Sequence, residues 1–395
     1  MSEQPARPYI GGQAVIEGVM MRSPSSVAIV CRRRSGELVV REQPMTAVSR
    51  GPRTWPFVRG VATLVESLRL GSQALRWSAD LYEQDLEAEE AAAAKGPASK
   101  RAPQSGSGKA SGASLTSLAL SMAAIAAQDV EPAPAAGSPA PGGDAAGAKK
   151  RGGGMGVLPI AFAVLLFVAA PQAGAELVNK LLGLGLEVTS PGFQAITGVA
   201  KLAIVVTYLL LIRQIPEVRR VFQFHGAEHK AISTYEAREA LEVENARRKT
   251  AMHPRCGTTF LVMVALVSIL VFSVAGASLG ALLPKPPGGR IVESIGFFLM
   301  KLPFLPLIAA VTFEIQRLFA RYCTTGPLRV LLWPGFLVQK ITTAEPDDAQ
   351  LEVALASLRA TLWREESVTA PAQPDRVFAD YSKLLADPGY AGAHG

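Results

Sequence analysis

Residues 258–283, TTFLVMVALVSILVFSVAGASLGALL, form a long apolar run without one charged side chain. A helix needs about 20 such residues to cross a bilayer, so this run predicts a membrane-spanning helix. Similar stretches lie at about 156–178, 194–214 and 293–320. The sequence therefore predicts a mainly α, polytopic membrane protein with about four transmembrane helices.

The composition of the whole chain agrees with this class. Only 18% of the residues are charged, and the mean hydropathy of +0.24 is too high for an ordinary soluble enzyme. The net charge of +7 could indicate nucleic acid, but in a membrane protein an excess of Lys and Arg marks the cytoplasmic side. The expected partner is thus the lipid bilayer, and nucleic acid is not expected.

Basic residues predict the orientation of the spans. They are concentrated just before the first span, in the central loop 215–257, and after the fourth span. By the positive-inside rule, both termini and the central loop are expected to be cytoplasmic. The three cysteines, Cys31, Cys256 and Cys323, are odd in number and far apart, which favours a reducing compartment over a disulfide framework. The N-terminus lacks the apolar segment of a cleavable signal peptide.

Residues 1–91 are expected to form a small cytoplasmic α+β module. Val27–Val30 and Leu38–Val40 flank a turn and predict a β-hairpin, whereas the preceding GGQAVIEGVMMRSP predicts a loop and a short strand. Apolar residues recur at helical spacing from Trp55 to about Glu90. This pattern predicts an amphipathic helix that lies on the membrane surface or against the hairpin.

The rest of the chain divides into three predicted segments. Residues 92–152 are rich in Ala, Gly, Pro and Ser and are expected to be a disordered linker. The four-span membrane domain, residues 153–342, ends in an interfacial stretch at 325–341. Residues 343–395 are expected to contain an amphipathic helix at 346–364 and a Pro-rich tail.

The central loop contains the motif His225-Gly-Ala-Glu228-His229, which includes two of only four histidines. On a helix, His225 and His229 lie one turn apart on the same face and can share one metal ion. The order H-x-x-E-H is the inverted zinc-protease pattern, in which both histidines bind zinc and the Glu acts as general base. The alternative is two histidines on the surface of a helix.

A second motif, His253-Pro-Arg-Cys256, lies just before the apolar run at 258–283. If His225, His229, His253 and Cys256 all bind, the shell is closed and typical of structural zinc. Three protein ligands would leave a position for water, as in catalytic sites. Alternatively, Cys256 is a reduced core thiol and His253 only caps the loop.

Three other carboxylates are candidates for additional ligands. Glu314 lies in the last third of the fourth span, where a carboxylate should have a partner, and the alternative is an ion pair with Arg317, Lys230 or Arg255. Glu236 returns to the helical face of His229 but is more suited to support a ligand than to bind the ion. Glu17 stands among glycines and could contribute from the N-terminal module.

Five segments in order resemble one family: GGQAVIEGVMMRSP, PFVRGVATLVESL, FHGAEHKAISTYE, HPRCGTTFL and ITTAEPDDAQLEVALASL. They are similar to the bacterial YqhQ-like family of multi-pass membrane proteins, and the resemblance covers nearly all of the chain except residues 92–152. It implies a bacterial cytoplasmic (inner) membrane location and a cytoplasmic His/Glu/Cys site with metal-dependent enzyme activity. Residues Glu17, Arg22, His225, Glu228, His229 and Cys256 match the family's motifs.

Three functions remain open at this point. The first is a zinc or other divalent-metal hydrolase that acts on a membrane-proximal substrate, with Glu228 as general base. The second is a scaffold or biogenesis factor that binds other membrane proteins or itself, with a structural metal or a hydrogen-bonded His/Cys network. The third is an oligomeric transporter in which Lys201, Lys301 and Glu314 line a polar path.

Overall fold

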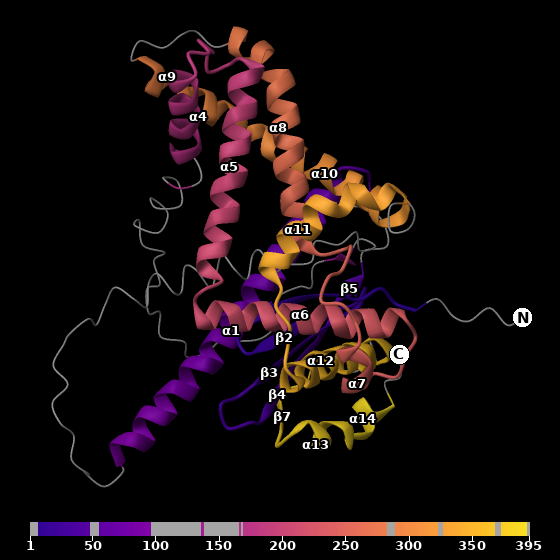
Figure 1. The fold of residues 1–395 in the computed structure, drawn as a ribbon. Helices are drawn as coiled ribbons and strands as arrows, with labels where there is room; N and C mark the ends of the chain where they lie inside the picture. The colour runs from indigo at the N-terminus through magenta and orange to yellow at the C-terminus, as the bar shows by residue number, and fades with distance from the viewer. Residues whose placement is uncertain are drawn as a thin grey trace, which may run out of the picture.

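A computed structural model describes residues 7–47, 55–95, 136–137, 166, 169–282, 289–322, 327–367 and 373–392. The predicted linker 92–152 lies almost wholly outside these residues, as does Cys323. The described chain is mainly helical and divides into a group of tall helices and a sheet with its own covering helices (Figure 1). Its strands are β1 (Gly11–Val15), β2 (Gly18–Arg22), β3 (Ser26–Arg32), β4 (Leu38–Pro44), β5 (Thr46–Ala47), β6 (Ala136–Gly137) and β7 (Arg376–Phe378).

The longer helices of the described chain carry the rest of the architecture. They are α1 (Val58–Lys95), α4 (Ala170–Leu181), α5 (Pro191–Ile212), α6 (Pro216–Glu236), α8 (Gly257–Leu282), α9 (Gly289–Lys301), α10 (Leu305–Tyr322), α11 (Trp333–Thr342) and α12 (Asp348–Glu366). Shorter helices are α7 (Val243–Arg247), α13 (Tyr381–Leu385), α14 (Pro388–Ala391) and the 3-10 helices η3 (Leu302–Phe304) and η4 (Pro327–Leu332).

The main sheet is antiparallel, with strand order β1-β2-β3-β4-β7. The predicted hairpin is present as β3 and β4, which pair from Ser26↔Pro44 to Arg32↔Leu38. The prediction of a loop and one short strand upstream was wrong, because GGQAVIEGVMMR forms a second hairpin, β1–β2. Its two-residue turn places Glu17 at φ 52°, a left-handed conformation uncommon for a residue with a Cβ. The tail adds β7 at the far edge of the sheet.

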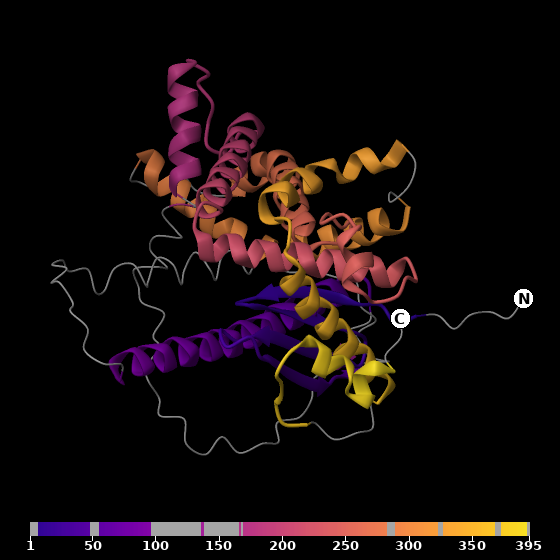
Figure 2. The same ribbon diagram turned by 60° about the horizontal axis from the view of Figure 1, so that its bottom comes forward.

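Each face of the sheet is covered by helices. Alternate strand residues such as Ala14, Met21 and Val30 pack with α6 and α12 in the largest core cluster. The opposite residues, including Val15, Met20 and Cys31, pack against α1 around Ala74. The long amphipathic helix predicted near residues 55–90 is therefore present as α1, and part of it covers the sheet (Figure 2). Because successive side chains of a strand point to opposite faces of the sheet, one set packs against α6 and α12 and the other against α1.

Helix α12 is the central helix of this sheet-packed region. Its start is stabilised by a capping box, in which the Asp347 side chain accepts from the Gln350 N–H and the Gln350 side chain accepts from the Asp347 N–H. The helix was predicted to be amphipathic, but it is buried around most of its circumference, and even Arg364 has no exposed surface. The sheet, α6 and the tail helices surround it and cover its polar side as well.

Three helices of the described chain are long and apolar enough to cross a membrane: Pro191–Ile212, Gly257–Val274 and Ile295–Phe319. They correspond to the second, third and fourth predicted spans. The first predicted span, 156–178, lies largely outside the described residues, and α4 covers its last part. Many leucines and valines of these helices are exposed, for example Leu211, Leu270 and Val274. Such exposed apolar surface is suited to lipid.

Helix α6 lies between the two regions. It runs below the lower ends of α5 and α8 and above the sheet, and the arrangement holds in both views (Figures 1 and 2). The connection from α11 to α12 crosses it, and the Ala344 N–H donates to the Phe222 carbonyl. A Cβ at Gly226 would lie 2.2 Å from the Ala344 carbonyl oxygen, so glycine is required for this close crossing.

Candidate metal centre

The histidines of the HGAEH motif lie on α6, the most deeply buried helix at the boundary between the two regions. Pro216 begins this helix, at the position where a missing N–H costs least. Although α6 carries many charged residues, His225, Glu228 and His229 have no exposed surface, because the sheet covers one side and the α11–α12 connection another. The alternative of two surface histidines is therefore wrong.

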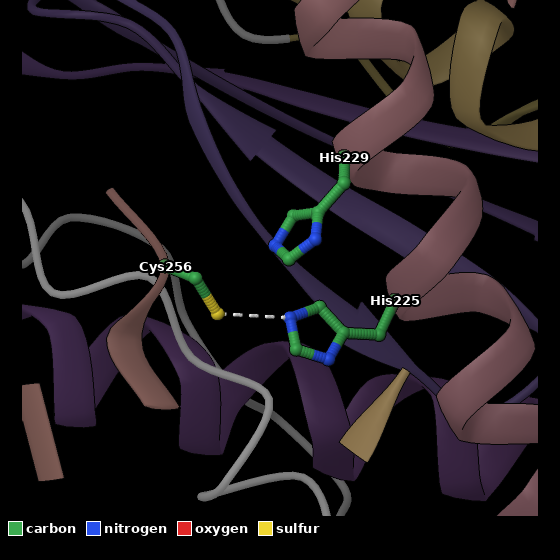
Figure 3. A group of neighbouring side chains, drawn as sticks. All are labelled: His225, His229 and Cys256. Carbon is green, nitrogen blue, oxygen red and sulfur yellow. Dashed lines mark hydrogen bonds between the residues drawn. The ribbon is translucent and has the colours of Figure 1, made fainter. Parts of the chain in front are cut away.

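Cys256 comes from the other region, at the residue before the spanning helix α8. The His225 Nε2 atom lies 3.2 Å from the Cys256 Sγ atom (Figure 3). One potential ligand atom from each of His225, His229 and Cys256 lies within 4.8 Å of the other two, and all three residues are buried. Ligands of a tetrahedral zinc ion, at about 2.0–2.3 Å from the metal, are about 3.5 Å apart, so a small contraction would accommodate an ion.

Hydrogen bonds orient both imidazoles for metal binding. His225 Nδ1 lies 3.0 Å from the Thr342 carbonyl oxygen, and His229 Nδ1 lies 2.6 Å from the Ala251 carbonyl oxygen. A carbonyl can only accept, so each Nδ1 carries a proton and donates it. In the neutral ring the lone pair is then on Nε2, the atom with which a histidine held in this way can bind a metal. This arrangement, a ligand histidine held by a backbone carbonyl, is typical of metal centres.

The first turn of α8 holds the Cys256 sulfur in place. The Thr258 backbone N–H donates to Sγ over 3.4 Å, and the Thr258 hydroxyl lies 3.0 Å from the same sulfur. These contacts fix where the Cys256 sulfur lies beside His225. The other described thiol, Cys31, lies in the sheet, and burial raises its pKa well above the usual range.

Residues of α11 that the sequence did not single out hold the centre together. The buried Gln339 accepts from the His253 N–H and donates from its amide to the His253 carbonyl, at 3.0 and 2.8 Å. The same amide lies 2.9 Å from the Thr259 hydroxyl oxygen. Thr342 supplies the carbonyl for His225. The available signal in the sequence was a glutamine directly after the apolar run Phe336–Val338.

His253 lies beside the centre rather than within it. Its ring centroid is 5.7 Å from that of His229, and its Nε2 is 3.3 Å from Glu236 Oε2. Glu236 also forms an ion pair with Arg255. Among the described residues, the group that could hold an ion therefore includes His225, His229 and Cys256. Glu236 was predicted to support His229, and its contacts are with His253 and Arg255.

Glu228 is buried on the same turn of α6 and points at β1. A Cβ at Gly12 would lie 2.7 Å from the Glu228 Oε1 atom, so the glycine provides room for the carboxylate. The GGQ segment of the first family motif thus meets the HGAEH motif directly. Both segments stood out in the sequence, but nothing in it predicted that they touch.

The two remaining candidate carboxylates form ion pairs away from the centre. Glu314 accepts from Arg59 of α1, with Nε to Oε1 at 2.8 Å, rather than pairing with the three basic residues named from the sequence. Glu17 accepts from Arg220 Nε over 2.6 Å, and this bond raises the pKa of the Arg220 guanidinium. Both pairs join the sheet-packed region to neighbouring helices.

Comparison with known proteins defines the family. Residues 55–364 match a family model described as "Protein of unknown function (DUF1385)". The chain is also 27% identical, over 368 residues, to "Uncharacterized protein YqhQ" of Bacillus subtilis (strain 168), which covers 92% of this chain and 95% of that protein. No solved structure matches the chain. Since the family model spans most of the sequence, the chain belongs to the DUF1385 family, and the predicted resemblance to YqhQ-like proteins is confirmed.

Proposed function

We propose that the protein is a membrane-embedded, metal-dependent hydrolase whose centre lies at the cytoplasmic membrane surface. The observation that carries the proposal is the buried set of His225, His229 and Cys256, whose potential ligand atoms lie within 4.8 Å of one another, with both rings oriented by Nδ1 hydrogen bonds. Zinc or another divalent metal held by these three side chains supplies Lewis-acid activation of water. Three protein ligands are the number found in catalytic rather than closed structural zinc sites.

Glu228 is the proposed general base. It directly precedes His229, and its contact with Gly12 fixes where the carboxylate lies. A carboxylate held in a dry site can accept a proton from water more readily than one in bulk solvent. A cavity reaches the ring of His253, which packs against His229, and offers a route for a substrate.

The proposed topology has four crossings with the centre on the cytoplasmic side. The sheet packs on α6, at the lower end of α5 and α8, whereas the α4–α5 connection lies at their other end (Figure 1). The apolar run at 156–178 supports one crossing in addition to the three apolar helices. The concentration of Arg and Lys in loop 215–257 supports the cytoplasmic assignment.

A second candidate function is a structural centre in a non-enzymatic scaffold. The observation that favours it is the complete burial of all three ligand side chains. A structural ion would join the sheet-packed region, through α6, to the spanning helix α8. In this case metal loss would loosen the boundary between the regions without removing any catalytic step.

The first experiment measures metal content of the detergent-purified chain by elemental analysis, with His229→Ala and Cys256→Ser beside the unchanged protein. About one zinc or similar ion per chain, lost in His229→Ala, is expected. Absence of metal from freshly purified protein, and no uptake on titration with zinc, would overturn the metal proposal. Lys383→Ala on α13 serves as a control far from the centre.

A second measurement separates the two functions. Glu228→Gln has the same shape and is expected to keep the metal while abolishing growth complementation in a deletion strain. If Glu228→Gln complements fully while His229→Ala does not, the scaffold function is favoured. Size-exclusion profiles of both variants establish whether a loss comes from misfolding.

A further inference from the structure

A cavity of about 740 Å³ is lined by His253, the histidine next to the candidate centre. One wall is polar and comes from α6 and the segment between α7 and α8, with Ser233, Glu236, Thr250 and His253. The other wall is apolar and comes from η4 and α11, with Val330, Trp333, Phe336 and Leu337. The volume is within the range of small-molecule sites, and the division into two walls matches an amphipathic ligand.

The apolar wall is placed at the level where the spans meet the sheet-packed region. Gly335 of α11 packs on Thr259 in the first turn of α8, so α11 lies at the end of a spanning helix. Val330, Trp333 and Leu337 are more than half exposed, which suits lipid contact at the membrane surface. Tryptophan is enriched at this depth because its ring is apolar and its N–H is polar.

Charge at the polar end favours an anionic head group. The Glu236 carboxylate is already engaged by Arg255 and His253, so it does not present a free negative charge. Lys340, in the last turn of α11, brings an exposed cation to the rim of the cavity. A lysine at the membrane surface attracts phosphate groups of lipids.

We propose that this cavity binds a phospholipid, with its phosphate at Lys340 and an acyl chain along Val330, Trp333 and Phe336. The head group then lies against His253, whose ring packs on His229 of the candidate centre. This inference rests on the proposed function, because it names the substrate class of the same centre. Lipid occupancy itself requires no metal, which allows the two proposals to be tested separately.

The test uses the full chain in nanodiscs that contain phosphatidylglycerol with a diazirine on its acyl chain. After photolysis, mass spectrometry maps the labelled peptides. Label is expected on residues 250–254 and 327–340. Ser233→Trp, which fills the cavity from its polar wall, is expected to reduce this label about tenfold, the change produced by about 1.4 kcal/mol of lost affinity. Leu270→Trp, on the exposed face of α8, is the matched control and should leave the amount of label in the cavity unchanged.

Lys340→Met tests the head group. It is expected to lower labelling by phosphatidylglycerol about fivefold, as removal of one lysine from an anionic surface predicts. Labelling by the uncharged diacylglycerol analogue should not change, and Lys383→Met is the control for charge alone. Label spread over the spans, with no dependence on Ser233→Trp or Lys340→Met, would overturn the proposal.

The His229→Ala chain separates this proposal from the hydrolase. If it retains cavity labelling, the lipid site stands whether or not a metal binds. If unchanged protein binds the lipid but releases no hydrolysis product from it, the hydrolase proposal fails while the lipid site remains.

Discussion

The sheet-packed region and the spanning helices bury their side chains in opposite ways. Helix α6 is polar in sequence, yet most of its residues are buried, because the sheet, α12 and the α11–α12 connection surround it. Helix α5 is strongly apolar, yet Val199, Leu210 and Leu211 are exposed. Apolar side chains are thus exposed on the helices of one region, whereas polar side chains are buried in the interior of the other. The candidate centre lies where the two regions meet.

The largest expected loss of stability comes from a substitution that disturbs the packing between the two regions. Gly226→Ala places a Cβ 2.2 Å from the Ala344 carbonyl oxygen, a backbone atom that cannot move alone. We expect a loss of about 3 kcal/mol in the free energy of unfolding, at the upper end for overpacking. Loss of the Thr342–His225 hydrogen bond should also lower metal content. Thermal unfolding in detergent and elemental analysis measure both.

Gly296→Ala is the matched control, because nothing lies within 4 Å of a Cβ there. It should be neutral or slightly stabilising, since alanine favours a helix by about 0.5–1 kcal/mol over glycine. Equal stability of the two variants would show that the crossing at Gly226 does not join the regions.

A pH change should alter the stability of the sheet-packed region. Burial raises the pKa of Glu42 to about 7, against the opposing effect of Arg376 and Arg364. The folded state then holds the proton more tightly than the unfolded state, so the stabilisation is complete below about pH 4.5 and is lost as the pH rises through 7. Glu42→Gln should match the unchanged protein at pH 4.5 and be more stable by about 2 kcal/mol at pH 8.

Hydrogen exchange of β4 and α12 amides, measured at both pH values, checks this expectation. Glu366→Gln, an exposed carboxylate at the end of α12, provides the control. If Glu42→Gln is equally stabilising at both pH values, Glu42 does not hold a proton in the folded state.

A smaller effect is expected at the contact of β1 with α6. Gly12→Ala brings a Cβ within 2.7 Å of Glu228 Oε1 and should cost about 1.5 kcal/mol, because the obstructing group is a side chain. Adding Glu228→Ala should recover most of that loss, whereas adding the isosteric Glu228→Gln should not. A double-mutant cycle on unfolding free energies measures the coupling, and strict additivity with Glu228→Ala would contradict the contact.

The smallest effect concerns the link between α1 and the spans. Arg59→Ala removes the pair with Glu314, and each partner is only about a quarter exposed. We expect a loss of about 1 kcal/mol, more than the near-zero value typical of open surface pairs. Arg248→Ala, which removes the exposed pair with Glu244, is the comparison, and the two losses should differ in unfolding assays.

Much of the chain could be predicted from local patterns. The long apolar runs predicted the spanning helices, because crossing a bilayer depends on length and composition within one segment. The β3–β4 hairpin and α1 followed from periodicities of two and 3.6 residues. The spacing of His225 and His229 placed both rings on one face of a helix, and their nearness to Cys256 in the structure agrees with that expectation.

Only the tertiary structure decided how these parts meet. Three contacts join residues that are between 86 and 216 positions apart in the chain: Gly12 with Glu228, Gly226 with Ala344, and Gln339 with His253. No local pattern contains such contacts, because they depend on how the sheet, α6 and α11 pack as whole elements. For the same reason Glu314 and Glu17, plausible ligands by type, pair with Arg59 and Arg220 instead. The sequence by itself determined which segments are long and apolar enough to cross a membrane and which side chains could bind metal, whereas packing decided which of them share a site.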